Sequence, residues 1–151
     1  MKCKALRRLP TFVPVPGRRR TDGWTPWRQA AFLGLLAETG SVRAAALRVG
    51  MTRETAYRLR RREGAESFAA AWDTIVRKLR GETDLPKRKV THFELVERAY
   101  HGSLRPILYR KAFKSVAQAP DPKAFRRLIG QVLSPRRDKD AGSESRGTGK
   151  V

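Results

Sequence analysis

The sequence has few of the residues from which disulfides and metal sites are built. Its 151 residues include one cysteine, Cys3, and two histidines. A single cysteine cannot form an internal disulfide, and Cys3 has no cysteine or histidine neighbour at the spacing of a zinc site. We therefore expect no metal and no cofactor, in a chain suited to a reducing cytoplasm.

Long apolar runs and catalytic constellations are missing as well. No apolar run approaches the ~20 residues of a membrane span, and the charged N-terminus contains no apolar stretch of signal-peptide length. The two histidines, His92 and His101, have no partner at metal or catalytic spacing. No carboxylate pair or Ser/His/Asp set is visible either, so we expect neither an enzyme nor a membrane span.

Acidic residues are scarce, and this is the strongest compositional signal. There are 14 Asp and Glu against 34 Lys and Arg, which gives a formal net charge of +20. The excess is spread along the chain, and residues 1–23 alone carry seven positive charges and one negative charge. A small chain this basic repels itself unless a polyanion neutralises it. Nucleic acid is therefore the leading expected partner, and a membrane surface is the second.

Residues 25–64 carry start and stop signals for three short helices. A polar residue suited to an N-cap opens each helix, and a glycine closes each one. The expected helices are 27–39, 42–49 and 53–62, and connections this short make them cross steeply around one small core. The caps are Thr25, Ser41 and Thr52, and the closing glycines are Gly40, Gly50 and Gly64.

The stretch 41–62, SVRAAALRVGMTRETAYRLRRR, resembles the helix-turn-helix DNA-binding motif. In that motif a small residue, here Ala46, lies four positions before a turn glycine, here Gly50, which can take a positive φ without strain. An apolar residue follows, here Met51. Two more positions face the core, here Ala56 and Leu59. Ala56 departs from the pattern, because a β-branched residue is commoner there.

The resemblance implies that the third helix reads DNA with the face opposite these core positions. Arginine can bond bidentately to guanine and glutamate can accept from cytosine, while the terminal arginine run is expected at phosphates. Arginines upstream of the first helix either enter the adjacent minor groove or only solubilise the chain. The predicted DNA-binding residues are Arg18, Arg19, Arg20, Ser41, Thr52, Arg53, Glu54, Tyr57, Arg58, Arg60, Arg61 and Arg62.

The rest of the chain is expected to support this unit. Apolar stripes predict helices over 66–80 and 92–100 and a last helix from 122 that Pro135 ends. Residues 107–109 and 115–117 predict a short hairpin across 111–114. Trp27 and Trp72 are expected in the core and Trp24 partly exposed.

The expected segments are a flexible basic arm (1–23), the helix-turn-helix unit (24–63), a supporting helix (64–80), a linker (81–91), a small C-terminal module (92–134) and a disordered tail (135–151).

Residues 40–76 are also similar to a group of small bacterial homeodomain-like helix-turn-helix proteins. Proteins of that group share the sequence pattern A-A-x-x-x-G-M-[ST]-R-x-[ST]-x-Y-R-L-R-R-R, followed by E-S-F-A-A-A-W-D. In this chain the second pattern occupies residues 66–73. Phage terminase small subunits begin with a related sequence. The resemblance covers about a third of the chain and is specific for the DNA-binding unit. Together with the apolar stripes it leads us to expect a mostly α protein: a tri-helical helix-turn-helix unit, a fourth helix and a small C-terminal α or α+β module.

These observations together predict sequence-specific binding to double-stranded DNA. The simplest role is a bacterial transcriptional regulator in the cytoplasm, associated with the nucleoid. One alternative is a terminase small subunit that recognises DNA for packaging, and another is a non-specific basic RNA-binding or membrane-surface protein. A preference for one duplex sequence would argue against the RNA-binding or membrane-surface alternative. A mass in solution that corresponds to a ring of many copies would favour the terminase alternative. The sequence leaves the oligomeric state open, including a homodimer.

Overall fold

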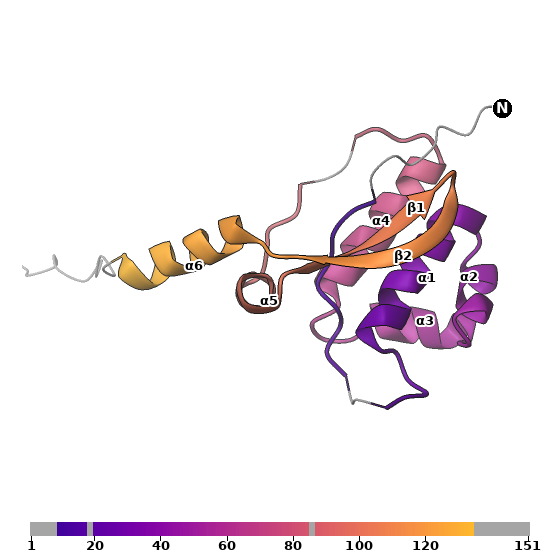
Figure 1. The fold of residues 1–151 in the computed structure, drawn as a ribbon, viewed down its shortest axis with the longest axis horizontal. Helices are drawn as coiled ribbons and strands as arrows, with labels where there is room; N and C mark the ends of the chain where they lie inside the picture. The colour runs from indigo at the N-terminus through magenta and orange to yellow at the C-terminus, as the bar shows by residue number, and fades with distance from the viewer. Residues whose placement is uncertain (1–8, 18–19, 85–86, 135–151) are drawn as a thin grey trace, which may run out of the picture.

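The computed structural model describes residues 9–17, 20–84 and 87–134. In that part the chain forms six helices and a two-stranded antiparallel sheet (Figure 1). The expected mostly α architecture is therefore confirmed. The elements are α1 (Pro26–Thr39), α2 (Val42–Arg48), α3 (Arg53–Arg60), α4 (Glu66–Leu79), α5 (His92–His101), β1 (Ser103–Tyr109), β2 (Ala112–Ala119) and α6 (Pro122–Leu133). The predicted tail 135–151 lies outside the described residues.

Local sequence signals fix where the first three helices begin. The hydroxyls of Thr25, Ser41 and Thr52 each accept the backbone N–H three residues further on, at 3.2, 3.3 and 3.3 Å. These bonds satisfy N–H groups that have no partner inside the helix. The predicted N-caps are confirmed, and the helices start within one residue of the expected positions.

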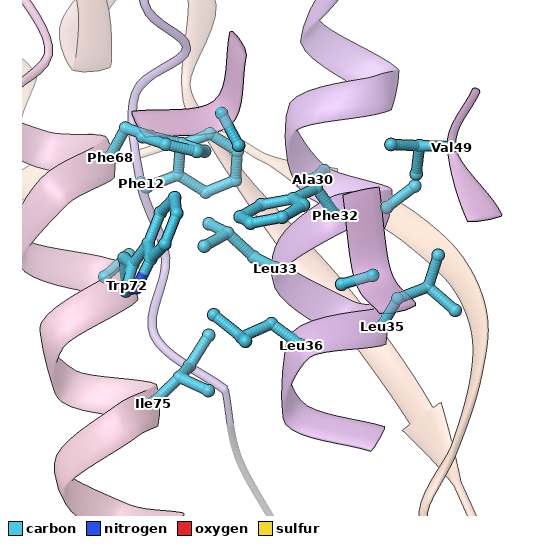
Figure 2. Close-up of a cluster of buried hydrophobic side chains, with 14 of the residues drawn as sticks. Phe12, Ala30, Phe32, Leu33, Leu35, Leu36, Val49, Phe68, Trp72 and Ile75 are labelled. Atoms are coloured by element: carbon cyan, nitrogen blue, oxygen red, sulfur yellow. The ribbon is translucent and has the colours of Figure 1, made fainter. Parts of the chain in front are cut away.

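The core is built around α1, which is buried on nearly every side. Figure 2 shows Phe68 and Trp72 of α4 turned toward Phe32 of α1. The ring centroids of Phe32 and Trp72 are 4.8 Å apart, close enough for a favourable aromatic contact. The predicted burial of Trp72 is confirmed, but that of Trp27 is wrong. Trp27 is 59% exposed at the first turn of α1, where it lies at the edge of β2 beside Phe113.

The N-terminal segment 9–17 is part of this core, so the expectation of a free arm over 1–23 is wrong for these residues. Phe12 is fully buried and its ring centroid lies 5.8 Å from that of Phe68. The backbone of Phe12 also pairs with that of Leu104 on β1, through N–H···O bonds of 3.0 and 2.9 Å. The segment is extended, as its prolines predict, but it packs against the helices beside the hairpin.

Two buried polar side chains hold this segment in register. The Gln29 amide on α1 accepts from the Val15 N–H at 2.7 Å and donates to the Val15 carbonyl at 3.1 Å. The Ser67 hydroxyl on α4 accepts from the Val13 N–H at 2.9 Å. A buried backbone amide needs such a partner. These bonds therefore explain why polar residues occupy fully enclosed positions on α1 and α4.

A hairpin of β1 and β2 covers the other side of α1. The sequence predicted this hairpin but placed its turn at 111–114, whereas the structure turns at Arg110 and Lys111, with φ of 48° and 71°. A Cβ atom on Gly34 of α1 would collide with the ring of Phe113 on β2, so glycine permits this close packing. The hairpin thus shares the main core and does not belong to a separate C-terminal module.

Glu38 at the end of α1 joins the hairpin to α2. One carboxylate oxygen pairs with Arg48 at 2.6 Å, and the other accepts from the Phe113 N–H at 2.7 Å. The bond to Arg48, together with that to the Phe113 N–H, lowers the pKa of Glu38 below its ordinary value. A sequence separation of 75 residues between Glu38 and Phe113 explains why no local pattern predicted this contact.

We expect Glu38→Gln to destabilise the fold by about 1 kcal/mol at neutral pH, because the ion pair with Arg48 becomes a hydrogen bond between a guanidinium and a neutral amide. Since the folded pKa is lowered, the carboxylate contributes its full stability above the unfolded value of 4.5. That contribution disappears as the pH falls through the folded pKa. Denaturant unfolding between pH 3 and 7 measures it: the wild type and Glu38→Gln should converge at the acid end, and a difference that stays constant would contradict this assignment.

Gly50 makes the turn between α2 and α3, as predicted, with φ of +74°. The Gly50 and Met51 N–H groups donate to the carbonyls of Leu47 and Ala46, which closes the end of α2. Apart from its two chain neighbours, no atom of the described residues lies within 4 Å of the position that a Cβ on Gly50 would take. A substitution here therefore costs energy only through the backbone.

We expect Gly50→Ala to lower the free energy of unfolding by about 1–2 kcal/mol, the cost of the left-handed conformation for an L residue. Gly50→Asn should cost less, because asparagine visits that conformation more readily. Thermal unfolding of the two variants checks both values. Equal melting temperatures for alanine, asparagine and glycine would mean that the turn does not depend on a positive φ.

Candidate nucleic-acid interface

The short helix α3 is fixed to the core by one face only. Ala56 and Leu59 are buried, as the sequence predicted. The N-terminus of α3 is held by a reciprocal pair of bonds, in which Thr52 and Thr55 each accept the other's backbone N–H at 3.3 Å. The cap and the two buried side chains set the rotation of α3. Residues on the opposite side are consequently turned to solvent.

Four of the predicted residues share this solvent-facing side. Arg53 and Glu54, in the first turn, lie 3.5 Å apart, and both side chains are mostly exposed. Arg58 and Arg61 are exposed and have no ion-pair partner within the described part of the chain. A bond to its own backbone N–H is the main cause that lowers the pKa of Glu54, so this side chain is a carboxylate at neutral pH. The surface therefore offers three guanidinium groups and one acceptor.

Two predicted residues are turned toward α4. The ring of Tyr57 lies 5.3 Å from that of Trp72, and Tyr57 is still 36% exposed. Arg60 pairs with Asp73 at 2.6 Å, and its guanidinium carbon lies 5.4 Å from the centre of the Trp72 ring. Its charge is thus already neutralised within the chain. The predicted contact of Arg60 with phosphate would have to break this ion pair, whereas Arg61 and Arg62 are exposed.

The N-terminal segment approaches the end of α3. The Arg62 Nη1 atom lies 3.4 Å from the position that a Cβ on Gly17 would take. Arg20 is exposed and pairs with Asp22 at 3.3 Å. In Figure 1 residues 20–23 and α3 lie toward the same end of the molecule. Arg18 and Arg19 lie outside the described residues.

The hydroxyls of Ser41 and Thr52, both predicted to contact DNA, act as N-caps in the structure. One exposed cation was not predicted: Arg43, in the first turn of α2 beside Ser41. It has no ion-pair partner among the described residues. Arg43 could have been found from the sequence, because it lies two residues after the predicted N-cap and therefore in the first turn of the helix.

Neither a metal site nor a spanning helix is found in the described ranges. No group of three or more His, Cys, Asp or Glu side chains is placed to hold a metal ion there. Within the same residues, every helix is too short or too polar to cross a membrane. The groups described at this end of the molecule are guanidinium groups, hydroxyls and carboxylates that include those of Asp22 and Glu54. Comparison of the chain with family models, curated proteins and solved structures found no match.

Proposed function

We propose that this protein binds double-stranded DNA in a sequence-specific manner, with α3 as the helix that enters the major groove. The observation that carries the proposal is the arrangement of α2 and α3. A glycine turn with positive φ joins the two helices, and Ala56 and Leu59 fix α3 to the core. The free side of α3 presents Arg53, Glu54 and Arg58, which are side chains suited to base edges.

The charge of the whole chain supports the same proposal. A net charge of +20 favours a polyanionic partner and supplies affinity that does not depend on sequence. Arg61 and Arg62 are exposed directly after α3, Arg43 is exposed in the first turn of α2, and all three are suited to phosphates. Phosphate contacts would then position the protein, and the first turn of α3 would select the site. A nucleoid-associated regulator is the simplest role for such a binder.

Selection of bound sites from a pool of random duplexes tests the proposal. The salt concentration must be stated, because affinity for DNA depends steeply on it. We expect a preferred site of a few adjacent base pairs to emerge, and an Arg53→Ala protein to lose preference at one of them. If the selected pool keeps no preference, the protein is a non-specific basic binder. A mass in solution that corresponds to a ring of many copies would favour DNA packaging over regulation.

The arginines before α1 are expected to bind phosphates. Deletion of this segment is unsuitable as a test, because Phe12 and Val15 belong to the core. We therefore expect Arg18→Gln, Arg19→Gln and Arg20→Gln together to weaken binding to all duplexes alike. The slope of log K against log salt should flatten by about 0.9 for each phosphate that is no longer neutralised. Titrations at several salt concentrations measure it, and an unchanged slope would show that these arginines only solubilise the chain.

A further inference from the structure

The hairpin of β1 and β2 carries a positive charge that no carboxylate of its own balances. Residues 103–119 contain four cations and no Asp or Glu. All four cations are exposed, and none has an ion-pair partner among the residues that the structure describes. They are Arg105, Arg110, Lys111 and Lys114. Like charges gathered on one small element attract an anion with several negative groups.

Three of these cations are at the turn of the hairpin. Arg110 and Lys111 form the turn with φ of 48° and 71°, a conformation that asparagine and glycine adopt at a lower cost. Lys114 follows at an irregularity in the pairing, opposite the step from Ile107 to Leu108. A strained backbone position that holds a long charged residue points to a use for that side chain.

An exposed aromatic side chain positions one of the three cations. The Arg110 guanidinium carbon lies 5.3 Å from the centre of the Tyr109 ring, within the range of a cation–π contact. Tyr109 is 61% exposed, so both groups face solvent. An uncharged ring orients the guanidinium without neutralising it. The charge of Arg110 therefore stays available to an anion from outside the chain.

The hairpin turn lies close to the start of α3. Glu38 binds Arg48 with one carboxylate oxygen and the Phe113 N–H with the other. Lys111 is two residues from Phe113, and Arg53 is five residues from Arg48. These short links place Lys111 and Arg53 closer together than one turn of duplex DNA, about 34 Å. Figure 1 shows the hairpin turn and α2 on the same side of the molecule, with α6 on the opposite side.

We propose that the hairpin turn binds backbone phosphates of the duplex beside the site that α3 reads. This inference rests on the function proposed above and adds a second contact surface from a distant part of the chain. The occupant is a DNA backbone, because the turn offers three unpaired cations within one helical turn of the reading helix. Contacts of this kind fix the position of a protein on DNA and carry no sequence information.

A variant of the hairpin turn tests the proposal. Arg110→Gln, Lys111→Gln and Lys114→Gln are combined in the full chain, and far-ultraviolet circular dichroism checks that the secondary structure is kept. The slope of log K against log salt should flatten by about 0.9 for each phosphate contact that is lost. Hydroxyl-radical footprinting on the selected duplex should show lost protection of the backbone on one flank and unchanged protection at the selected base pairs.

The control removes three charges from α6. Lys123→Gln, Arg126→Gln and Arg127→Gln replace cations that are exposed and that lack an ion-pair partner within the described ranges. We expect this variant to keep both the slope and the footprint of the wild type. A general effect of net charge would instead flatten the slopes of the two variants alike.

Equal slopes for the wild type and the hairpin variant overturn the proposal. So does equal flattening in the hairpin variant and the control, or a flank that stays protected in the hairpin variant. The slopes are also measured on a scrambled duplex, so they test the hairpin even if α3 selects no sequence. Failure of sequence selection has a different result, which is equal affinity of the wild type for the two duplexes.

Discussion

Replacement of Phe12 by alanine is expected to lower the free energy of unfolding by about 3–5 kcal/mol, the range for a large aromatic side chain removed from a core. Phe12 is fully buried, and its ring contacts that of Phe68 on α4. Its backbone pairs with Leu104 on β1. The side chain therefore joins the N-terminal segment, the helices and the hairpin. Loss of so large a share of a typical folding free energy leaves a marginal domain.

Phe125→Ala is the matched control for this prediction. It removes the same atoms from α6, where Phe125 is 48% exposed, and should cost much less than the change at Phe12. Denaturant unfolding at low protein concentration compares the two variants and keeps any self-association out of the result. Similar small losses for both would mean that residues 9–17 are not part of the cooperative core.

The second large effect is expected at Arg53. Arg53→Ala should cost about 1–3 kcal/mol on the preferred duplex and little on scrambled DNA, because the variant can no longer bond to one base. Arg53 is in the first turn of α3, exposed, with Glu54 at 3.5 Å. A recognition helix presents its N-terminal residues to the floor of the major groove of DNA. The effect should therefore be a relaxed preference at one base pair.

Arg61→Ala is the control for Arg53, since Arg61 lies at the far end of α3 and is suited to a phosphate. It should weaken binding to preferred and scrambled duplexes about equally. Arg60→Ala should affect stability more than binding, because Arg60 pairs with Asp73. Paired binding curves on both duplexes separate these cases. If Arg53→Ala lowers both affinities by the same factor, Arg53 contacts a phosphate and the proposed reading face is wrong.

The helices could be predicted because their signals are local. Caps at Thr25, Ser41 and Thr52 and the turn at Gly50 act within a few residues, and each was recognisable in the sequence. The role of Arg60 could also have been inferred from spacing. It stands four residues after the buried Ala56, so it lies toward the core side of α3, where it pairs with Asp73 of α4.

The packing of the N-terminal segment was not predicted, because its partners are distant in the sequence. The prolines and arginines of 1–23 suggested an arm. What decides the position of Phe12 is Leu104 on β1, together with the amide of Gln29 and the hydroxyl of Ser67. Trp27 was misplaced for a similar reason, since the hairpin edge beside it comes from residues near 113.

A specificity ratio decides whether α3 selects a DNA sequence. The measurement compares the affinity of the full chain for its selected duplex with that for a scrambled duplex and for double-stranded RNA of the same sequence, at one stated salt concentration. We predict that the selected duplex binds at least about 10³-fold more tightly than either competitor. Equal affinity for all three would show that the charge of +20 alone drives binding, and would contradict sequence-specific recognition by α3.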